Sequence, residues 1–241
     1  MKISNGNINS RMLSVYAWLT TLFKKEDIQL TMIRAYYALA SGTNSYKIGL
    51  SAGNNELTAD KTQVLIGKND GFAPVAGRMV VRKAVGSNYA VAEEATFEDK
   101  TIFNAPNGGS GFTENENIRG LYFGSKVNLD VEGDAILDGL PAELFRFVPP
   151  TQAGSAAVAQ MGDPLSYSSF TNLYKDVILA GGTDVAIKIQ LSGFTPDAKI
   201  VGDSSVSGEQ NYVGFHLIGF QIKGGDNKTM ELSDNQNCAV R

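Results

Sequence analysis

The chain has 241 residues, of which 43% are hydrophobic, so it is long and apolar enough to fold around a sizeable core. Its net charge of -4 and pI near 5.1 exclude a general electrostatic attraction to nucleic acid or to an anionic membrane. A single cysteine excludes an intrachain disulfide framework. The first residues lack the charged-then-apolar order of a signal peptide, and the longest apolar run is too short to span a bilayer. We therefore expect a soluble protein made in the cytoplasm.

Residues 1–42 differ from the rest of the chain and are expected to form an N-terminal arm with a helix. No proline or glycine interrupts most of this segment, and Ser10 can cap the start of a helix. The charged run at residues 24–27 breaks the helical pattern. The segment therefore predicts either two helices or one helix followed by a first strand at residues 29–38.

The arm also carries a local positive charge and the only tryptophan of the chain. One interpretation is that the arm packs on its own barrel or on a neighbouring subunit. The other is that it touches lipid headgroups, because an aromatic residue with basic flanks suits a membrane interface. Under either interpretation, Arg11, Trp18, Lys24 and Lys25 are the candidates for contact with a membrane or a partner.

From residue 43 onward, short apolar runs alternate with turn residues, as expected of a β sandwich or barrel. One of these runs predicts a strand at residues 78–85, after a turn at residues 68–71. Pro149-Pro150 interrupts the series, and this position is the best candidate for a boundary or for a long crossover loop within a barrel. About a dozen strands exceed what one simple sandwich uses. The chain is therefore expected to be either one large β domain or two smaller ones.

The most informative run is the strand predicted at residues 212–223, which is apolar on both alternating faces. One face carries Tyr212, Ile218, Phe220 and Ile222, and the other carries Val213, Phe215 and Leu217. A half-exposed strand would alternate apolar with polar residues. We therefore expect a second sheet on one face and a helix, sheet or subunit on the other. Phe215, Leu217 and Phe220 are accordingly candidates for an interface between copies.

The sequence indicates no catalytic or cofactor site. His216 is the only histidine and lies inside the most apolar strand, which favours a satisfied core or interface residue over a general base. One histidine and one cysteine do not supply the ligand set of a zinc site, and no phosphate-binding loop or nucleophile elbow is present. The basic residues Arg78, Arg82 and Lys83 are a weak signal for nucleic-acid binding, because acidic residues follow closely. We expect no enzyme activity, no cofactor, no metal and no sequence-specific nucleic-acid partner.

Carboxylates are the one chemically suggestive group. Asp130, Glu132, Asp134 and Asp138 crowd together around Gly133. Alternation along the strand favours a solvent-exposed position for the side chains of Asp130, Glu132 and Asp134. Calcium binding and a carboxylate pair for glycoside hydrolysis stay open as alternatives, because both depend on the fold.

Taken together, the arm, the long series of short strands and the doubly apolar strand at residues 212–223 resemble the double jelly-roll major capsid protein of a tailless, membrane-containing bacteriophage. The resemblance implies two consecutive β barrels, at residues 43–148 and 149–241. The resemblance covers the whole chain but includes no diagnostic motif. It implies homotrimers that tile an icosahedral shell, often over an internal lipid membrane, with penton or spike proteins as further partners. It also implies assembly in the host cytoplasm, localisation to the virion and no catalytic residues.

Two other classes of function stay open. A different virion component, such as a tail tube, spike or decoration protein, would form rings or pentamers. A carbohydrate-active or carbohydrate-binding β sandwich would be a monomer with a carboxylate pair in a cleft or an aromatic shelf on one sheet.

Overall fold

The computed structural model describes residues 8–51, 63–85, 93–95, 119–146, 170–192, 195–196, 200–202, 208–225, 230–232 and 238–240. The elements in chain order are α1 (Ile8–Leu22), η1 (Lys25–Asp27), β1 (Ile28–Ala38), β2 (Ser45–Gly49), β3 (Gly71–Val85), β4 (Glu93–Ala95), β5 (Ser125–Val131), β6 (Asp134–Pro141), η3 (Ala142–Phe145), β7 (Thr171–Asn172), β8 (Val177–Ala180), β9 (Val185–Leu191), β10 (Glu209–Ile222), β11 (Met230–Leu232) and β12 (Cys238–Val240). The expected all-β fold class is confirmed.

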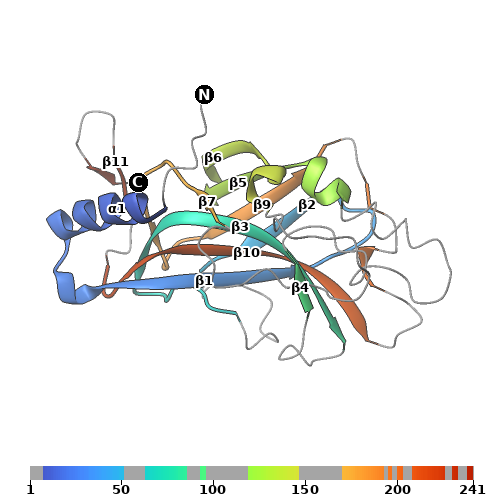
Figure 1. Ribbon diagram of the computed structural model, residues 1–241, viewed down its shortest axis with the longest axis horizontal. Helices are drawn as coiled ribbons and strands as arrows, with labels where there is room; N and C mark the ends of the chain where they lie inside the picture. Colours follow the sequence, from blue (N-terminus) through green and yellow to red (C-terminus); the bar gives the residue numbers. More distant parts are fainter. Residues whose placement is uncertain are drawn as a thin grey trace.

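The strands form two antiparallel sheets (Figure 1). The larger sheet has the order β1-β10-β3-β8-β11-β12, with the short strands β4 and β7 also paired to β3. The smaller sheet has the order β2-β9-β5-β6. The chain changes sheet between β1 and β2, β2 and β3, β4 and β5, β6 and β7, β8 and β9, and β9 and β10. The strands β5 and β6 follow one another within the smaller sheet as a hairpin. That hairpin turns through Glu132 and Gly133, whose φ angles of 52° and 94° suit a two-residue turn with positive φ at both central positions.

Strands from both sides of residue 149 pair with one another in both sheets. In the larger sheet, β10 lies between β1 and β3, and in the smaller sheet β9 lies between β2 and β5. The prediction of one barrel at residues 43–148 and another at 149–241 is therefore not confirmed. Backbone pairing within the described residues joins the two halves into one sandwich.

Strand β10 is covered on both faces, as its sequence predicts. Val213, Phe215 and Leu217 lie in the core between the two sheets, together with side chains of β2, β5 and β9. On the opposite face, Ile218 and Phe220 pack against helix α1. Apolar burial on both faces of a central strand accounts for its continuous hydrophobic sequence.

The N-terminal segment is one helix followed by a strand, which confirms the second of the two expected arrangements. Figure 1 shows α1 beside the ends of β3 and β10, and its residues Val15 and Leu19 are almost fully buried there. The chain then enters β1, which pairs with β10 along its whole length. Residues 28–38 of the expected arm are thus a strand of the sandwich.

Strand β3 begins seven residues earlier than the predicted start at residue 78, at Gly71, and it runs through Pro74. Proline cannot donate a backbone hydrogen bond, so a central strand tolerates it only at an irregularity. The pairing with β10 shifts register at this point, between Ile218 and Gly219. A Cβ atom at Gly219 would come within 2.2 Å of the Ala73 carbonyl oxygen, so only glycine fits opposite the shift.

Candidate functional site

The outer face of the larger sheet holds a cluster of buried polar side chains beyond the area that α1 covers. It is centred on His216 of β10, with Arg78 and Arg82 of β3 and Tyr36 of β1 around it. All four residues are at most 5% exposed. Buried groups of this kind stabilise a fold only when their hydrogen bonds are made.

Both ring nitrogens of His216 are engaged. Arg78 donates to Nδ1 from Nε at 3.2 Å and from Nη2 at 3.1 Å, and Nε2 lies 2.9 Å from the Tyr36 hydroxyl oxygen. Because a guanidinium group can only donate, Nδ1 must be the acceptor. The hydrogen of the neutral ring therefore sits on Nε2 and is donated to Tyr36.

Two aromatic rings flank this network. The Arg82 guanidinium lies 4.7 Å from the ring centre of Tyr36, and that of Arg78 lies 4.8 Å from the ring centre of Phe170. The cluster therefore ties β1, β10 and β3 together on one face.

This geometry gives His216 a structural role. A general base needs a free lone pair that a substrate proton can reach. The lone pair on Nδ1 is occupied by Arg78, and the ring is only 2% exposed. The expectation of a satisfied core histidine is confirmed.

The four candidate residues of the arm have different surroundings. Arg11 donates from Nε to the Leu173 carbonyl oxygen at 2.9 Å and pairs with Asp176 at 2.5 Å, so it fastens α1 to the body of the same chain. Trp18 is partly buried against the cluster beneath α1. Lys24 and Lys25 are exposed after the helix, so they remain available to a partner.

The three candidates for an interface strand lie inside the chain. Phe215 and Leu217 are 1% exposed in the core between the sheets, and Phe220 is 7% exposed beneath α1. Side chains this deeply buried have almost no surface left for another subunit. These three side chains therefore pack within their own chain, and not against another subunit as we expected.

The acidic residues around Gly133 do not form one group. Asp130 is only 5% exposed and pairs with Lys188, so the expected solvated position is wrong for this residue. Glu132, Asp134 and Asp138 are exposed, as expected. In the part of the chain that the structure describes, no three His, Cys, Asp or Glu side chains are grouped so as to hold a metal ion.

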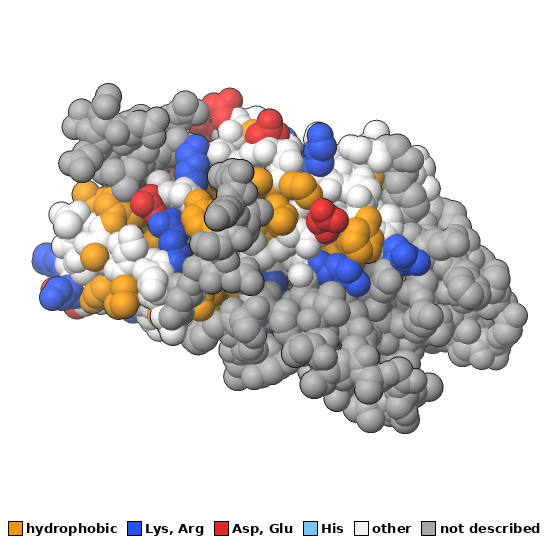
Figure 2. Space-filling view, turned by 45° about the horizontal axis from the view of Figure 1, so that its top comes forward, with side chains coloured by type: hydrophobic (Ala, Val, Ile, Leu, Met, Phe, Trp, Pro, Cys, Tyr) orange, Lys and Arg blue, Asp and Glu red, His pale blue; other side chains and the backbone are white. Residues whose placement is uncertain are grey.

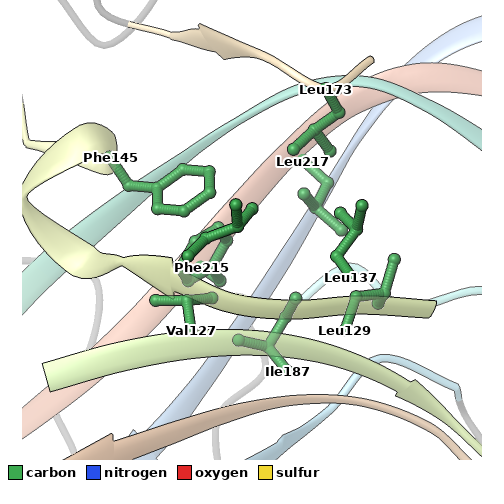
Figure 3. Close-up of a pocket in the computed structure, with 9 residues that line it drawn as sticks. Val127, Leu129, Leu137, Phe145, Leu173, Ile187, Phe215 and Leu217 are labelled. Atoms are coloured by element: carbon green, nitrogen blue, oxygen red, sulfur yellow. The ribbon is translucent and has the colours of Figure 1, made fainter. Parts of the chain in front are cut away.

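A small cavity lies between the two sheets (Figure 3). Its volume is about 10 Å³, and its lining is entirely apolar: Val127, Leu129, Leu137, Leu140, Phe145, Leu173, Ile187, Phe215 and Leu217. A space of this size holds at most about one water molecule, and apolar cavities stay dry. The cavity is a packing gap and is too small for a substrate.

The described surface mixes charge and apolar side chains. Figure 2 shows single acidic and basic side chains scattered among hydrophobic ones, without a large area of one charge. The large apolar side chains exposed in the described residues are Leu13, Leu22, Leu30, Tyr37, Val64, Phe123 and Tyr174. Among the helices that the structure describes, none has the length and hydrophobicity needed to cross a bilayer.

Comparison of this chain with protein-family models, curated proteins and solved structures found no match.

Proposed function

We propose that this protein is a structural virion protein, a coat subunit that acts by assembling with copies of itself. The observation that carries the proposal is the strand order of the two sheets. Eight strands in chain order are β1, β2, β3, β5, β6, β8, β9 and β10. In the larger sheet the neighbours are β1, β10, β3 and β8, which are strands 1, 8, 3 and 6 of this series. In the smaller sheet the neighbours are β2, β9, β5 and β6, which are strands 2, 7, 4 and 5.

This order supports a jelly-roll fold. A jelly roll is a double sheet of eight strands whose connections repeatedly cross from one sheet to the other, and it is a common architecture of viral capsid subunits. On this assignment the chain is one jelly roll built from both of its halves. The order alone does not set the function, because lectin domains and cupins share the architecture.

The side chains of the described residues favour the coat subunit among these alternatives. The histidine is held in a structural network, Asp130 is paired with a lysine, and the cavity in Figure 3 is apolar and about 10 Å³ in volume. These features do not supply the carboxylate pair in a cleft that glycoside hydrolysis requires. They suit a protein that functions through surface contacts with other copies of itself.

One jelly roll per chain changes the expected stoichiometry. A trimer of double jelly rolls offers six barrels, so it can tile a shell as a pseudo-hexagon. A homotrimer of this chain would offer three, so a hexagonal tile would take two trimers or six copies. Penton or spike proteins would be the further partners in the virion. The exposed Lys24 and Lys25 would be available to an internal membrane.

The test is the mass of the purified protein in solution, measured by light scattering over a range of concentration and salt, with negative-stain microscopy of the same samples. We expect trimers or larger closed oligomers, and sheets or shells at high concentration. Stacked rings would favour a tail tube. A monomer under all conditions would contradict the proposal, and glycan binding by that monomer would establish the carbohydrate-binding alternative.

A further inference from the structure

Strand β1 forms one edge of the larger sheet, and alternate residues point their backbone groups in opposite directions. The odd-numbered residues face β10. This is seen beyond both ends of β1, where Lys223 donates to the Asp27 carbonyl oxygen at 2.9 Å and Leu39 donates to the Asn211 carbonyl oxygen at 2.8 Å. The even-numbered residues face away, as Arg34 shows by exchanging two backbone hydrogen bonds with Val64.

Val64 bonds the edge of β1 at Arg34. The edge residues that precede Arg34 have no such backbone partner among the described residues. The N–H and C=O groups of Leu30 and Met32 point away from β10, and within the described residues no backbone group bonds them. The Ile28 N–H is already bonded to the Lys25 carbonyl oxygen, so the open stretch begins at the Ile28 C=O. The Leu30 side chain is 44% exposed beside this edge.

The edge of the smaller sheet at β6 is protected by contrast. Lys175 donates from its ammonium group to the Ile136 carbonyl oxygen at 3.1 Å, and the strand carries Asp138 and ends at Pro141. Lysine, charge and proline at an edge all prevent another strand from pairing with it. Residues 28–32 carry no charged side chain and no proline.

We propose that a second copy of this chain pairs its β1 antiparallel with this open stretch, about a two-fold axis that passes through residues 28–32. An antiparallel edge is complementary to itself, because each copy presents the same N–H and C=O groups of Leu30 and Met32. Pairing about this axis brings no like charges together, because residues 28–32 are uncharged. It also buries the exposed Leu30 side chain of both copies. Because Val64 occupies the edge at Arg34, the pairing can extend only over the stretch before it. The same stretch of a second copy has the matching length. The inference rests on the proposed self-assembly and names one of its contacts.

The test is residue-resolved hydrogen–deuterium exchange of the wild-type protein, at a concentration where it is dissociated and at one where it is assembled. Exchange at the Leu30 and Met32 amides should slow by about tenfold or more on assembly. The neighbouring amides of Gln29 and Thr31 face β10 and should be protected under both conditions. Unchanged exchange at Leu30 and Met32 in assembled protein would overturn the inference and leave the proposed function standing.

A matched pair of variants gives a second readout. Leu30→Lys places a charge at the open edge, and Leu13→Lys places one on α1 at a leucine that is 70% exposed. Leu30→Lys should weaken self-association by about tenfold or more, while Leu13→Lys should not, with the far-UV circular dichroism of both unchanged. Equal association of Leu30→Lys and wild type would overturn the inference alone. A wild-type protein that stays monomeric at all concentrations would overturn the proposed function together with it.

Discussion

At the scale of single residues, His216 is the point where three strands of the larger sheet are joined by side chains. Its ring accepts from Arg78 of β3 and donates to Tyr36 of β1. Removing one partner of a buried network leaves the other groups without hydrogen bonds, at the cost of their desolvation. The network should therefore be measurable as stability.

We expect His216→Phe to lower the free energy of unfolding by about 1–3 kcal/mol, because the Arg78 guanidinium and the Tyr36 hydroxyl lose a buried partner. Tyr36→Phe is the milder comparison, since it removes a single hydroxyl group. Urea denaturation of both variants and of the wild type measures the effect. A His216→Phe protein as stable as the wild type would show that the network contributes nothing.

Tyr46 gives a prediction for alkaline pH. Burial raises the pKa of its hydroxyl from 10.0 to about 12, and the hydroxyl donates a hydrogen bond to the Ala40 carbonyl oxygen at 2.9 Å. Between pH 10 and pH 12 the unfolded chain ionises this group while the folded protein keeps it protonated. Its stability contribution is therefore complete below pH 10 and is lost as the pH rises toward 12, by roughly 3 kcal/mol in total.

The measurement is the urea midpoint as a function of pH for the wild type and for Tyr46→Phe. The variant should lose stability less steeply between pH 10 and pH 12. If the two curves keep a constant separation over this range, burial of Tyr46 is not the cause of the slope.

Residue patterns predicted the character of His216 but not its partners. A lone histidine in an apolar strand indicates a satisfied core residue, and it is one. Arg78 and Tyr36 become its neighbours only through the pairing of β10 with β3 and β1, and a single sequence does not reveal that register. Asp130 was misplaced for a similar reason, because Lys188 reaches it from the neighbouring strand β9.

At the scale of elements, helix α1 completes the second hydrophobic layer of the protein. Leu19 is fully buried against β3 and β10, whereas Leu13 on the same helix is 70% exposed. We expect Leu19→Ala to lower the unfolding free energy by about 2–5 kcal/mol through loss of apolar burial and creation of a cavity.

Leu13→Ala is the control for this substitution, because it makes the same chemical change in the same helix at an exposed position. It should alter stability by no more than about 0.5 kcal/mol. Thermal or urea denaturation distinguishes the two. Equal effects would mean that α1 does not cover the sheet in solution.

The sequence predicted elements where hydrophobic periodicity was strong. The helix, the first strand and the two apolar faces of β10 were all visible in the pattern. The start of β3 was not, because Pro74 normally argues against a central strand and the register shift that accommodates it leaves no signal in one sequence.

At the scale of the whole molecule, each sheet is built from both halves of the chain. Both sheets contain strands from each side of residue 149, so neither half can complete a sheet without the other. The prolines that suggested a boundary do interrupt the strand pattern, but an interruption along the chain does not report on pairing across it. Strand partners depend on long-range contacts, and these cannot be read from the spacing of apolar runs.

We expect a single unfolding transition for the whole chain. Trp18, the only tryptophan, reports on the layer beneath α1, and far-UV circular dichroism reports on the sheets. The two signals should change at the same denaturant concentration. Two separated transitions would instead indicate independently stable halves.

The pairing of β1 with β10 also constrains how the protein is made. Tyr36 and His216 touch across 180 residues of sequence, so β1 leaves the ribosome long before its partner strand exists. Contacts of such long range form late and slowly, and an unpaired strand edge exposed in the meantime invites aggregation. The edge of β1 that pairs with β10 therefore stays unpaired until synthesis is nearly finished. A chain that ends before β10 cannot form the pairing of β1, β10 and β3 at the centre of the larger sheet.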